Sequence, residues 1–167
     1  MLFGIQFLFA GLILPEDNSE LNYIHVVFEW EQIPEAIGYE LQVSENPSFS
    51  SLVMEVIDSS LIYLEKNDLD WDKTYHWRVR PLYELNETGD WSTAYIFSTG
   101  SPLSGTTATI FNVDLMQDGI TVFGSFFNYF SAAVDKTGKE IWNSGVENLV
   151  YYSTNESGDV FGCALVS

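Results

Sequence analysis

Positive charge is scarce in this sequence, which has 6 Lys and Arg residues against 24 Asp and Glu residues and a formal net charge of −18. A protein that binds nucleic acid needs a basic stripe to displace counterions from the phosphates, so the composition argues against this class of partner. Anionic membrane surfaces are disfavoured for the same electrostatic reason. The acidity predicts solubility in a salty or extracellular setting rather than a specific cationic ligand.

Cysteine and histidine are also rare, with one Cys and two His. Cys163 has no partner for an internal disulfide, and inside the apolar run 160–166 we expect it to be a small buried hydrophobe. His25 and His76 fall at outward positions of predicted strands, where a His is more often a surface residue than a metal ligand. No Gly-rich phosphate loop opens a helix, and no Gly-x-Ser-x-Gly motif occurs. We therefore expect no catalytic centre, cofactor or metal in this chain.

Apolar material is plentiful, at 46% hydrophobic and 16% aromatic residues. The stretch 69–80 shows how it is arranged, because Tyr75, Trp77 and Val79 alternate strictly with polar residues, which is typical of a half-buried strand. Similar short segments, separated by turns at a spacing of roughly 8–12 residues, predict an antiparallel β-sandwich. The predicted strands are 24–30, 39–44, 52–57, 61–64, 75–80 and 91–99.

The first part of the chain, about 15–99, resembles a fibronectin type III domain in the order, spacing and type of its residues. The segments that carry the resemblance are Phe28-Glu29-Trp30, 38–44, Leu69 with 75–79, Trp91-Ser92 and Phe97-Ser98-Thr99. The resemblance implies an immunoglobulin-like antiparallel sandwich with the Trp30 indole at the centre of its core. It also implies that the Tyr75 hydroxyl bonds to the backbone of the preceding loop.

After a linker at 100–107, the remaining part, 108–167, has short apolar segments at 119–124, 131–135, 140–142 and 160–162. A tight hairpin is predicted at 135–140, with Gly138 at positive φ, and 155–159 repeats its chemistry. Residues 133–142 and 118–123 resemble the opening blade of a β-propeller of the arylsulfotransferase or quinoprotein type. The spacing between Asp135 and the Thr-Gly pair is one residue shorter than in the quinoprotein repeat, which favours an arylsulfotransferase-like or a generic propeller interpretation.

The expected fold is therefore all-β, a sandwich followed by a partial propeller blade or a small β-meander. A single blade cannot bury both faces of its sheet, so we expect the chain to be the N-terminal part of a longer protein with further blades beyond Ser167. Arylsulfotransferase-like enzymes are expected to use a histidine nucleophile. No His follows His76, so no catalytic residue carries over to this chain.

The apolar segment 1–14 ends at Pro15 and is shorter than a membrane span. One interpretation is a shortened signal peptide, and the other is a strand that packs on the following domain. Residues 15–22 read as a polar linker.

The surface residues of interest are Arg78, Arg80 and Trp91. A stacked Arg–Trp arrangement on the polar face of the strand at 75–80 would form an interaction surface, and the alternative is that both arginines only offset neighbouring carboxylates. Asp68, Asp70 and Asp72 alternate as in a calcium loop. They lack the Gly and the distal Glu of an EF-hand, which favours a solvated turn.

These features predict a secreted, periplasmic or cell-surface protein whose sandwich is a spacer or binds a protein or glycan ligand. The alternative is the accessory N-terminal region of an arylsulfotransferase-like propeller enzyme. A third hypothesis is a structural subunit whose exposed blade edge pairs with a neighbour.

Overall fold

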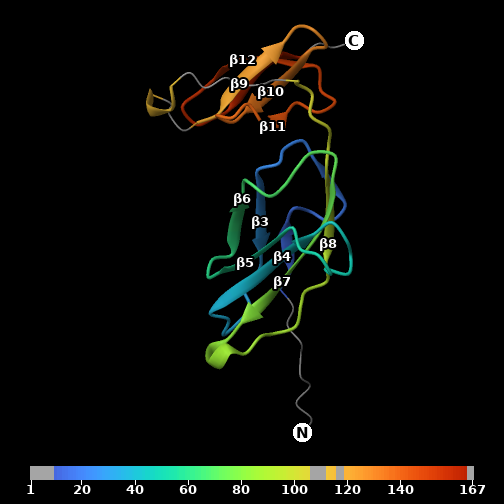
Figure 1. The fold of residues 1–167 in the computed structure, drawn as a ribbon, viewed down its shortest axis with the longest axis vertical. Coiled ribbons are helices and arrows are strands. Elements are labelled where there is room, and N and C mark those ends of the chain that lie inside the picture. Colours follow the sequence, from blue (N-terminus) through green and yellow to red (C-terminus); the bar gives the residue numbers. More distant parts are fainter. Residues whose placement is uncertain (1–9, 106–111, 116–118, 165–167) are drawn as a thin grey trace. The chain divides into compact units, whose positions relative to one another are not determined.

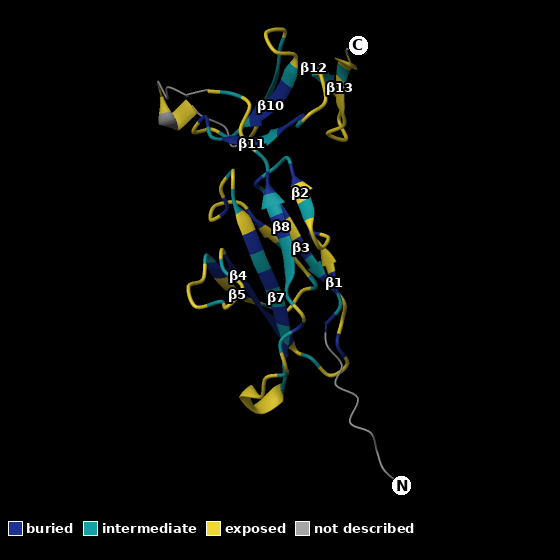
Figure 2. Cartoon of the chain, turned by 90° about the vertical axis from the view of Figure 1, so that its right-hand side faces the viewer, coloured by how far each residue is buried: buried dark blue, intermediate teal, exposed yellow. Residues whose placement is uncertain are grey.

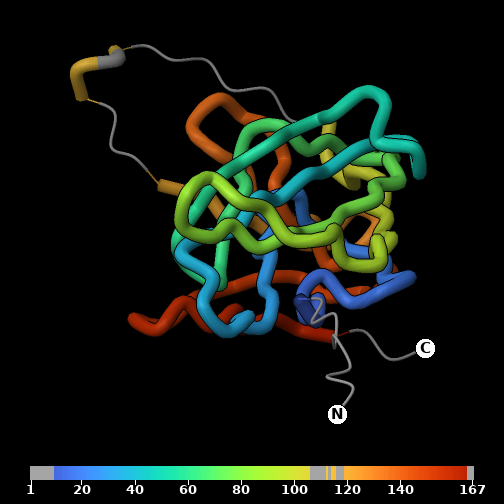
Figure 3. Tube along the Cα trace, turned by 90° about the horizontal axis from the view of Figure 1, so that it is seen from below, coloured from blue at the N-terminus to red at the C-terminus, as the bar shows by residue number. Residues whose placement is uncertain are grey.

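The computed structural model describes residues 10–105, 112–115 and 119–164, which divide into two compact units (Figure 1). The first unit holds the described residues up to Leu21 together with His25–Thr99, and the second holds Asn22–Ile24 and the described residues from Gly100. Both units are built from strands. The helical turns in the described ranges are η1 (Glu84–Asn86) and η2 (Val113–Leu115), the latter lying between two ranges drawn in grey (Figure 3). Neither has the length or apolar character of a helix that crosses a membrane.

The first unit is a sandwich of two sheets. The strands of the smaller sheet, in spatial order, are β1 (Leu12–Leu14), β3 (Val26–Trp30) and β6 (Ile62–Glu65). The strands of the larger sheet, in spatial order, are β2 (Ser19–Leu21), β8 (Tyr95–Thr99), β7 (Thr74–Leu82), β4 (Gly38–Ser44) and β5 (Met54–Asp58). All neighbours are antiparallel except β2 and β8. This fibronectin type III-like arrangement confirms the predicted fold class.

The core of the sandwich is aromatic. Buried and half-buried residues alternate along β7, as the bands in Figure 2 show, so that Trp77 points inward. Its ring packs edge-on against Phe28 at 5.2 Å between centroids, and Phe28 in turn contacts Phe97 at 5.9 Å. Such ring pairs contribute about 0.5–1.5 kcal/mol each beyond area burial. Trp30, 1% exposed, lies in this core as predicted.

Tyr75 ties β7 to the loop before it. Its hydroxyl oxygen accepts a hydrogen bond of 2.9 Å from the backbone N–H of Asp70, which confirms the predicted bond to the loop backbone. In the same loop, the N–H of Asp68 donates to the Glu65 carboxylate at 2.8 Å. The aspartates at 68, 70 and 72 thus belong to a hydrogen-bonded turn. In the ranges that the structure describes, no group of three or more His, Cys, Asp or Glu side chains is arranged to hold a metal ion.

The N-terminal expectations need correction. Residues 10–14, expected to precede the sandwich, belong to it, because Leu12 pairs with Trp30 and is only 8% exposed. The strand interpretation therefore holds for β1, and residues 1–9 lie outside the described residues. The polar linker at 15–22 contains β2, which pairs in parallel with β8. These residues join the sandwich because an extended chain beside a sheet edge satisfies its backbone hydrogen bonds by pairing with that edge.

The second unit contains a sheet ordered β11 (Glu140–Asn143), β10 (Phe130–Val134) and β9 (Thr121–Ser125), and a hairpin of β12 (Leu149–Thr154) and β13 (Val160–Ala164). The segment Asn22–Ile24 extends the sheet beside β11. The N–H of Ile24 donates to Ile141 O at 3.0 Å, and the N–H of Asn143 donates to Asn22 O at 2.9 Å. Ile24 was expected in a sandwich strand, and that assignment is wrong because its backbone pairs with β11.

The hairpin packs on the sheet through small residues. A Cβ atom at Gly124 of β9 would lie 2.7 Å from Tyr151 N, so glycine allows the backbone of β12 to approach. Ser131 of β10 donates to Leu149 O at 2.6 Å and accepts from Tyr151 N at 2.7 Å. In β13, Cys163 is exposed, which corrects its expected burial. Among the described strands β13 pairs with β12 alone.

Candidate functional site: an arginine–aromatic ladder

The outward face of β7 brings together the residues singled out in the sequence. Arg78 and Arg80 alternate with the buried residues of β7, and the register sets Arg78 opposite Gln42 and Arg80 opposite Glu40 on β4. Residues opposite each other in an antiparallel pair share a face of the sheet. The larger sheet therefore carries two guanidinium groups above two polar side chains of the neighbouring strand.

Aromatic rings from two loops pack on these guanidinium groups. The Cζ atom of Arg78 lies 4.0 Å from the ring centroid of Phe49 and 4.2 Å from that of Trp91. The Cζ atom of Arg80 lies 4.5 Å from the Trp91 ring. These four residues, Phe49, Arg78, Trp91 and Arg80, form what we call the Arg–aromatic ladder. Each cation–π contact at a partly exposed site contributes about 0.5–1 kcal/mol.

Side chains of β4 hold the two guanidinium groups in place through hydrogen bonds. Arg78 donates through Nε and Nη2 to Gln42 Oε1, at 3.1 and 2.7 Å. The Gln42 amide nitrogen donates in turn to Glu55 Oε1 at 2.6 Å. Arg80 forms an ion pair of 2.6 Å with Glu40, whose side chain is 10% exposed. All seven residues of β4 are buried, and the two that bond the ladder arginines are Glu40 and Gln42.

Local backbone contacts position the two rings. The loop that carries Phe49 is held by Asn46, whose side-chain oxygen accepts from the Ser48 hydroxyl at 2.7 Å, and Phe49 itself has φ of 53°. Trp91 precedes β8 and is fixed by its neighbour Ser92. The N–H of Ser92 donates to Val79 O at 2.9 Å, and the Ser92 hydroxyl accepts from the N–H of Val79 at 3.1 Å.

The electrostatics of the ladder are asymmetric. The pKa of Arg78 lies below its ordinary value, because burial removes the guanidinium from water and the charge of Arg80 repels it, while Glu40 acts in the opposite direction. An Arg pKa is so high that the group stays charged at neutral pH. Arg80 is neutralised by Glu40, whereas Arg78 bonds a neutral amide. The ladder therefore presents one cation without a carboxylate partner among the described residues.

The sequence found part of this arrangement. Stacking of Trp91 on the arginines was one of its two alternatives, and the structure shows that contact. Both alternatives for the arginines hold in part, because Arg80 does offset a carboxylate. Phe49 was missed, since its role depends on a loop conformation. Gln42 and Glu40 would have been found from the register between β4 and β7, which periodicity alone does not give. His76, on the same face of β7, is half-buried and is not one of the ring or hydrogen-bond partners of Arg78 and Arg80.

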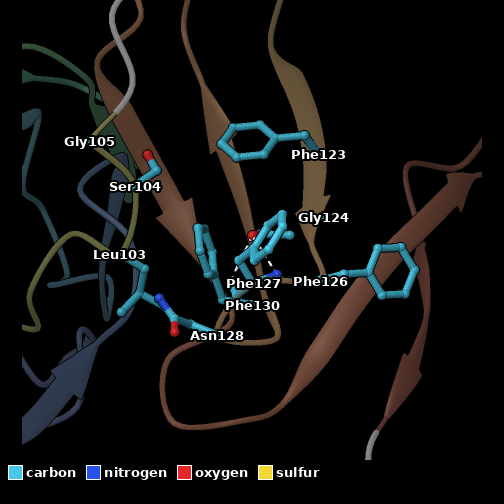
Figure 4. A pocket seen from close by; sticks show the side chains of 10 residues that line it. Leu103, Ser104, Gly105, Phe123, Gly124, Phe126, Phe127, Asn128 and Phe130 are labelled. Atoms are coloured by element: carbon cyan, nitrogen blue, oxygen red, sulfur yellow. Dashed lines mark hydrogen bonds between the residues drawn. The ribbon is translucent and has the colours of Figure 1, made fainter.

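A second candidate lies in the other unit, where an open hollow of about 620 Å³ sits beside the β9–β10 turn (Figure 4). Phenylalanine rings dominate its lining, and the aromatic and aliphatic residues are Leu103, Phe123, Phe126, Phe127 and Phe130. In Figure 4 the ring of Phe126 points away from the other rings. Phe126 and Phe127 are 75% and 87% exposed. The polar side chains in its lining are the uncharged Ser104, Ser125 and Asn128, so the hollow lacks the charged groups of the ladder and is the weaker candidate.

No family model and no curated protein matches this sequence. Among solved structures, a Fn3-like protein from Clostridium thermocellum is 13% identical, with a TM-score of 0.42, and the match covers 53% of this chain and 93% of that chain. A human fibronectin type III domain, from the protein KIAA0970, is 20% identical with a TM-score of 0.42, covering 59% and 86%. An α-L-rhamnosidase from Dictyoglumus thermophilum is 16% identical with a TM-score of 0.41, covering 71% and 15%. The fold assignment rests on the strand order and register described above.

Proposed function

We propose that the sandwich is a binding module of a secreted, periplasmic or cell-surface protein, and that the Arg–aromatic ladder is its contact surface for a protein or glycan ligand. A fibronectin type III-like sandwich fits the role of a spacer or binding domain. The observation that carries the proposal is the ladder itself, in which hydrogen bonds and ring contacts hold two guanidinium groups and two aromatic rings in one fixed array.

The chemistry of the ladder suits recognition. Trp and Arg are enriched at positions that dominate binding energy, and a fixed array loses little conformational entropy on binding. A guanidinium has five N–H donors. Arg78 uses two of them for Gln42, and Arg80 uses its Nε, at 2.7 Å, and its Nη2, at 2.6 Å, for Glu40. The remaining donors suit acceptor-rich ligands, such as sugar hydroxyls or a carboxylate. The unneutralised charge of Arg78 favours a ligand with a negative group at that point.

The test is binding of the full chain to a glycan array and to purified extracellular matrix proteins. The proposal predicts a saturable interaction in which the ligand is recovered unchanged, and its loss in Trp91→Ala. The matched control is Ile37→Ser, which removes a 55%-exposed aliphatic side chain from the loop before β4 and should leave binding unchanged. Binding that survives in Trp91→Ala, or is lost equally in both variants, would contradict the assignment of the surface.

The second unit supports a second candidate function, the accessory N-terminal region of an arylsulfotransferase-like propeller enzyme. Its sheet, extended by Asn22–Ile24, has a β-hairpin packed on its face, as neighbouring blades of a propeller do. The two hairpin turns repeat each other closely, since Gly138 and Gly158 both have φ of 86°. Asp135 and Asn155 accept the corresponding backbone N–H groups in each turn.

The parent gene decides this second candidate. Further β-hairpin repeats after Ser167, with a histidine on an inner strand, would support an enzyme whose catalytic residues lie outside this chain. A stop codon directly after Ser167 would contradict it. In either case the binding role of the sandwich is tested separately, because it depends on residues of the first unit alone.

A further inference from the structure

The outer face of the smaller sandwich sheet is aliphatic, although one face of an antiparallel sheet is commonly polar when it meets water. Val27 lies opposite Leu64, and Glu29 lies opposite Ile62 on one side and Leu14 on the other. Opposite residues in an antiparallel pair point to the same side of the sheet. The four aliphatic side chains are exposed to similar extents: Leu14 38%, Val27 37%, Ile62 54% and Leu64 44%. We call these residues, with Glu29, the aliphatic face.

Glu29 is the charged group of this face. It stands on the central strand β3 and is half-buried among the aliphatic side chains. Within the described residues its carboxylate has neither a hydrogen bond nor an ion pair. No Lys or Arg occurs in β1, β3 or β6, so these strands supply no cation to it. A carboxylate whose surroundings become drier on docking gains more from a cation than one in open water does.

We propose that the aliphatic face is a docking surface for a partner protein segment that presents an Arg or Lys side chain flanked by aliphatic side chains. Apolar contact would remove the exposed aliphatic area from water, and the cation would pair with Glu29. A second copy of this chain is a poor occupant, because two chains of net charge −18 repel each other and a symmetric contact would set Glu29 near its own copy. This surface lies on the opposite sheet from the Arg–aromatic ladder, so the two proposals stand independently.

The test uses three end-blocked pentapeptides titrated against the full, isotope-labelled chain and followed by backbone amide NMR. Val-Arg-Val-Arg-Val is the probe, Val-Glu-Val-Glu-Val reverses the charge, and Ser-Arg-Ser-Arg-Ser keeps the charge without the aliphatic groups. The proposal predicts saturable shifts at β1, β3 and β6 with the probe, none with the acidic peptide, and much weaker shifts with the serine peptide. Shifts that map elsewhere, or equal binding of the two cationic peptides, would overturn it.

Paired variants separate this surface from general electrostatics. Glu29→Gln should weaken probe binding about two- to fivefold, the range of a partly exposed ion pair. Glu20→Gln removes an equal charge from β2 and should leave binding unchanged. Leu64→Asn should abolish saturable binding, and Ile57→Asn, at a 70%-exposed position of β5, should not. Equal losses in the two glutamate variants would overturn the proposal even if Leu64→Asn failed to fold. Dimerisation of the peptide-free chain through these strands would also overturn it, in favour of a second copy.

Discussion

The Cζ atom of Arg78 lies 4.2 Å from the ring centroid of Trp91. The same guanidinium also packs on Phe49, with its Cζ atom 4.0 Å from the ring centroid, and donates two hydrogen bonds to Gln42 Oε1. One side chain of β7 therefore joins the loop after β4 and the segment before β8 to the larger sheet. The ladder stabilises the module as well as presenting a surface.

Replacing Arg78 with Lys tests the stabilising part of the ladder. Arg78→Lys keeps the charge but removes the planar fork that bonds Gln42 and stacks on both rings. The free energy of unfolding should fall by about 1–2 kcal/mol, the sum expected for a hydrogen bond and a weakened cation–π contact. Urea unfolding followed by circular dichroism measures it. Lys73→Ala is the comparison, because its ion pair with Glu45 is exposed to solvent and such pairs contribute little to stability. An equal or larger loss in Lys73→Ala would contradict this account.

Tyr75→Phe tests the hydrogen bond between the Tyr75 hydroxyl and the loop before β7. The variant keeps the buried ring but leaves the N–H of Asp70 without the phenol oxygen, which should cost about 1–2 kcal/mol. Burial raises the pKa of Tyr75, partly offset by the Asp70 hydrogen bond, so the phenol ionises first in the unfolded chain. Its contribution is complete below pH about 10 and is lost as pH rises further. In urea titrations at alkaline pH, the free energy of unfolding should decline less steeply with pH for Tyr75→Phe than for wild type. Parallel declines would show that the buried Tyr75 hydroxyl does not contribute to stability.

Asp135→Asn tests the hairpin turn of the second unit. Burial acts to raise the pKa of Asp135, but hydrogen bonds from Thr137, Lys139 and Gly138 outweigh it and hold the pKa below its ordinary value. The carboxylate therefore stabilises the fold above pH about 4, and this contribution is lost as pH falls through the lower folded-state pKa.

Asn155 accepts the corresponding N–H groups in its own turn without a charge, so Asp135→Asn should keep the turn. The free energy of unfolding of the second unit should then fall less steeply at acid pH than in wild type. Fluorotryptophan labelling resolves Trp142, the one Trp after Gly100, as the reporter of this unit. If the free energy of unfolding of Asp135→Asn fell as steeply at acid pH as that of wild type, Asp135 would not be the source of the pH dependence.

Gly124→Ala tests the close approach of β12 to β9. The new Cβ would lie 2.7 and 2.8 Å from the backbone N and O of Tyr151, and a backbone cannot yield as a flexible side chain can. We expect a loss of about 1–3 kcal/mol, typical of overpacking, in the transition that Trp142 reports. Gly119→Ala is the matched control, because a Cβ atom added there would meet no atom of the described residues within 4 Å. Equal stabilities of the two variants would show that the hairpin does not need the glycine.

Periodicity predicted much of the sandwich because its strands are half-buried and have one apolar face. β7 shows this most clearly, since Tyr75, Trp77 and Val79 are all at most 1% exposed. Periodicity says nothing about which strand is the neighbour. Ile24 continues the alternation of β3 but pairs with β11, because the partner is set by backbone hydrogen bonds that its side-chain pattern does not encode.

The second unit was harder to predict for a related reason. β12 was missed because Leu149, Val150, Tyr151 and Tyr152 form a continuous apolar and aromatic run, which hides the alternation of a half-buried strand. The Arg–aromatic ladder was likewise predicted only in part from the sequence. Arg78 and Arg80 share a face by simple alternation, whereas the place of Phe49 depends on a loop residue with φ of 53°. A positive φ at a Phe has no sequence signal of the kind that glycine provides.

We propose that the Arg–aromatic ladder is the contact surface of the sandwich, and side-chain NMR of the full chain is the test of this role. In a spectrum of the full chain titrated with a ligand selected from the glycan or matrix-protein screen, the indole N–H signal of Trp91 and the Nε–H signals of Arg78 and Arg80 should shift and saturate together. The indole signals of Trp30 and Trp77, which are buried in the core, should stay in place. Saturable binding with the Trp91, Arg78 and Arg80 signals unmoved would contradict the claim.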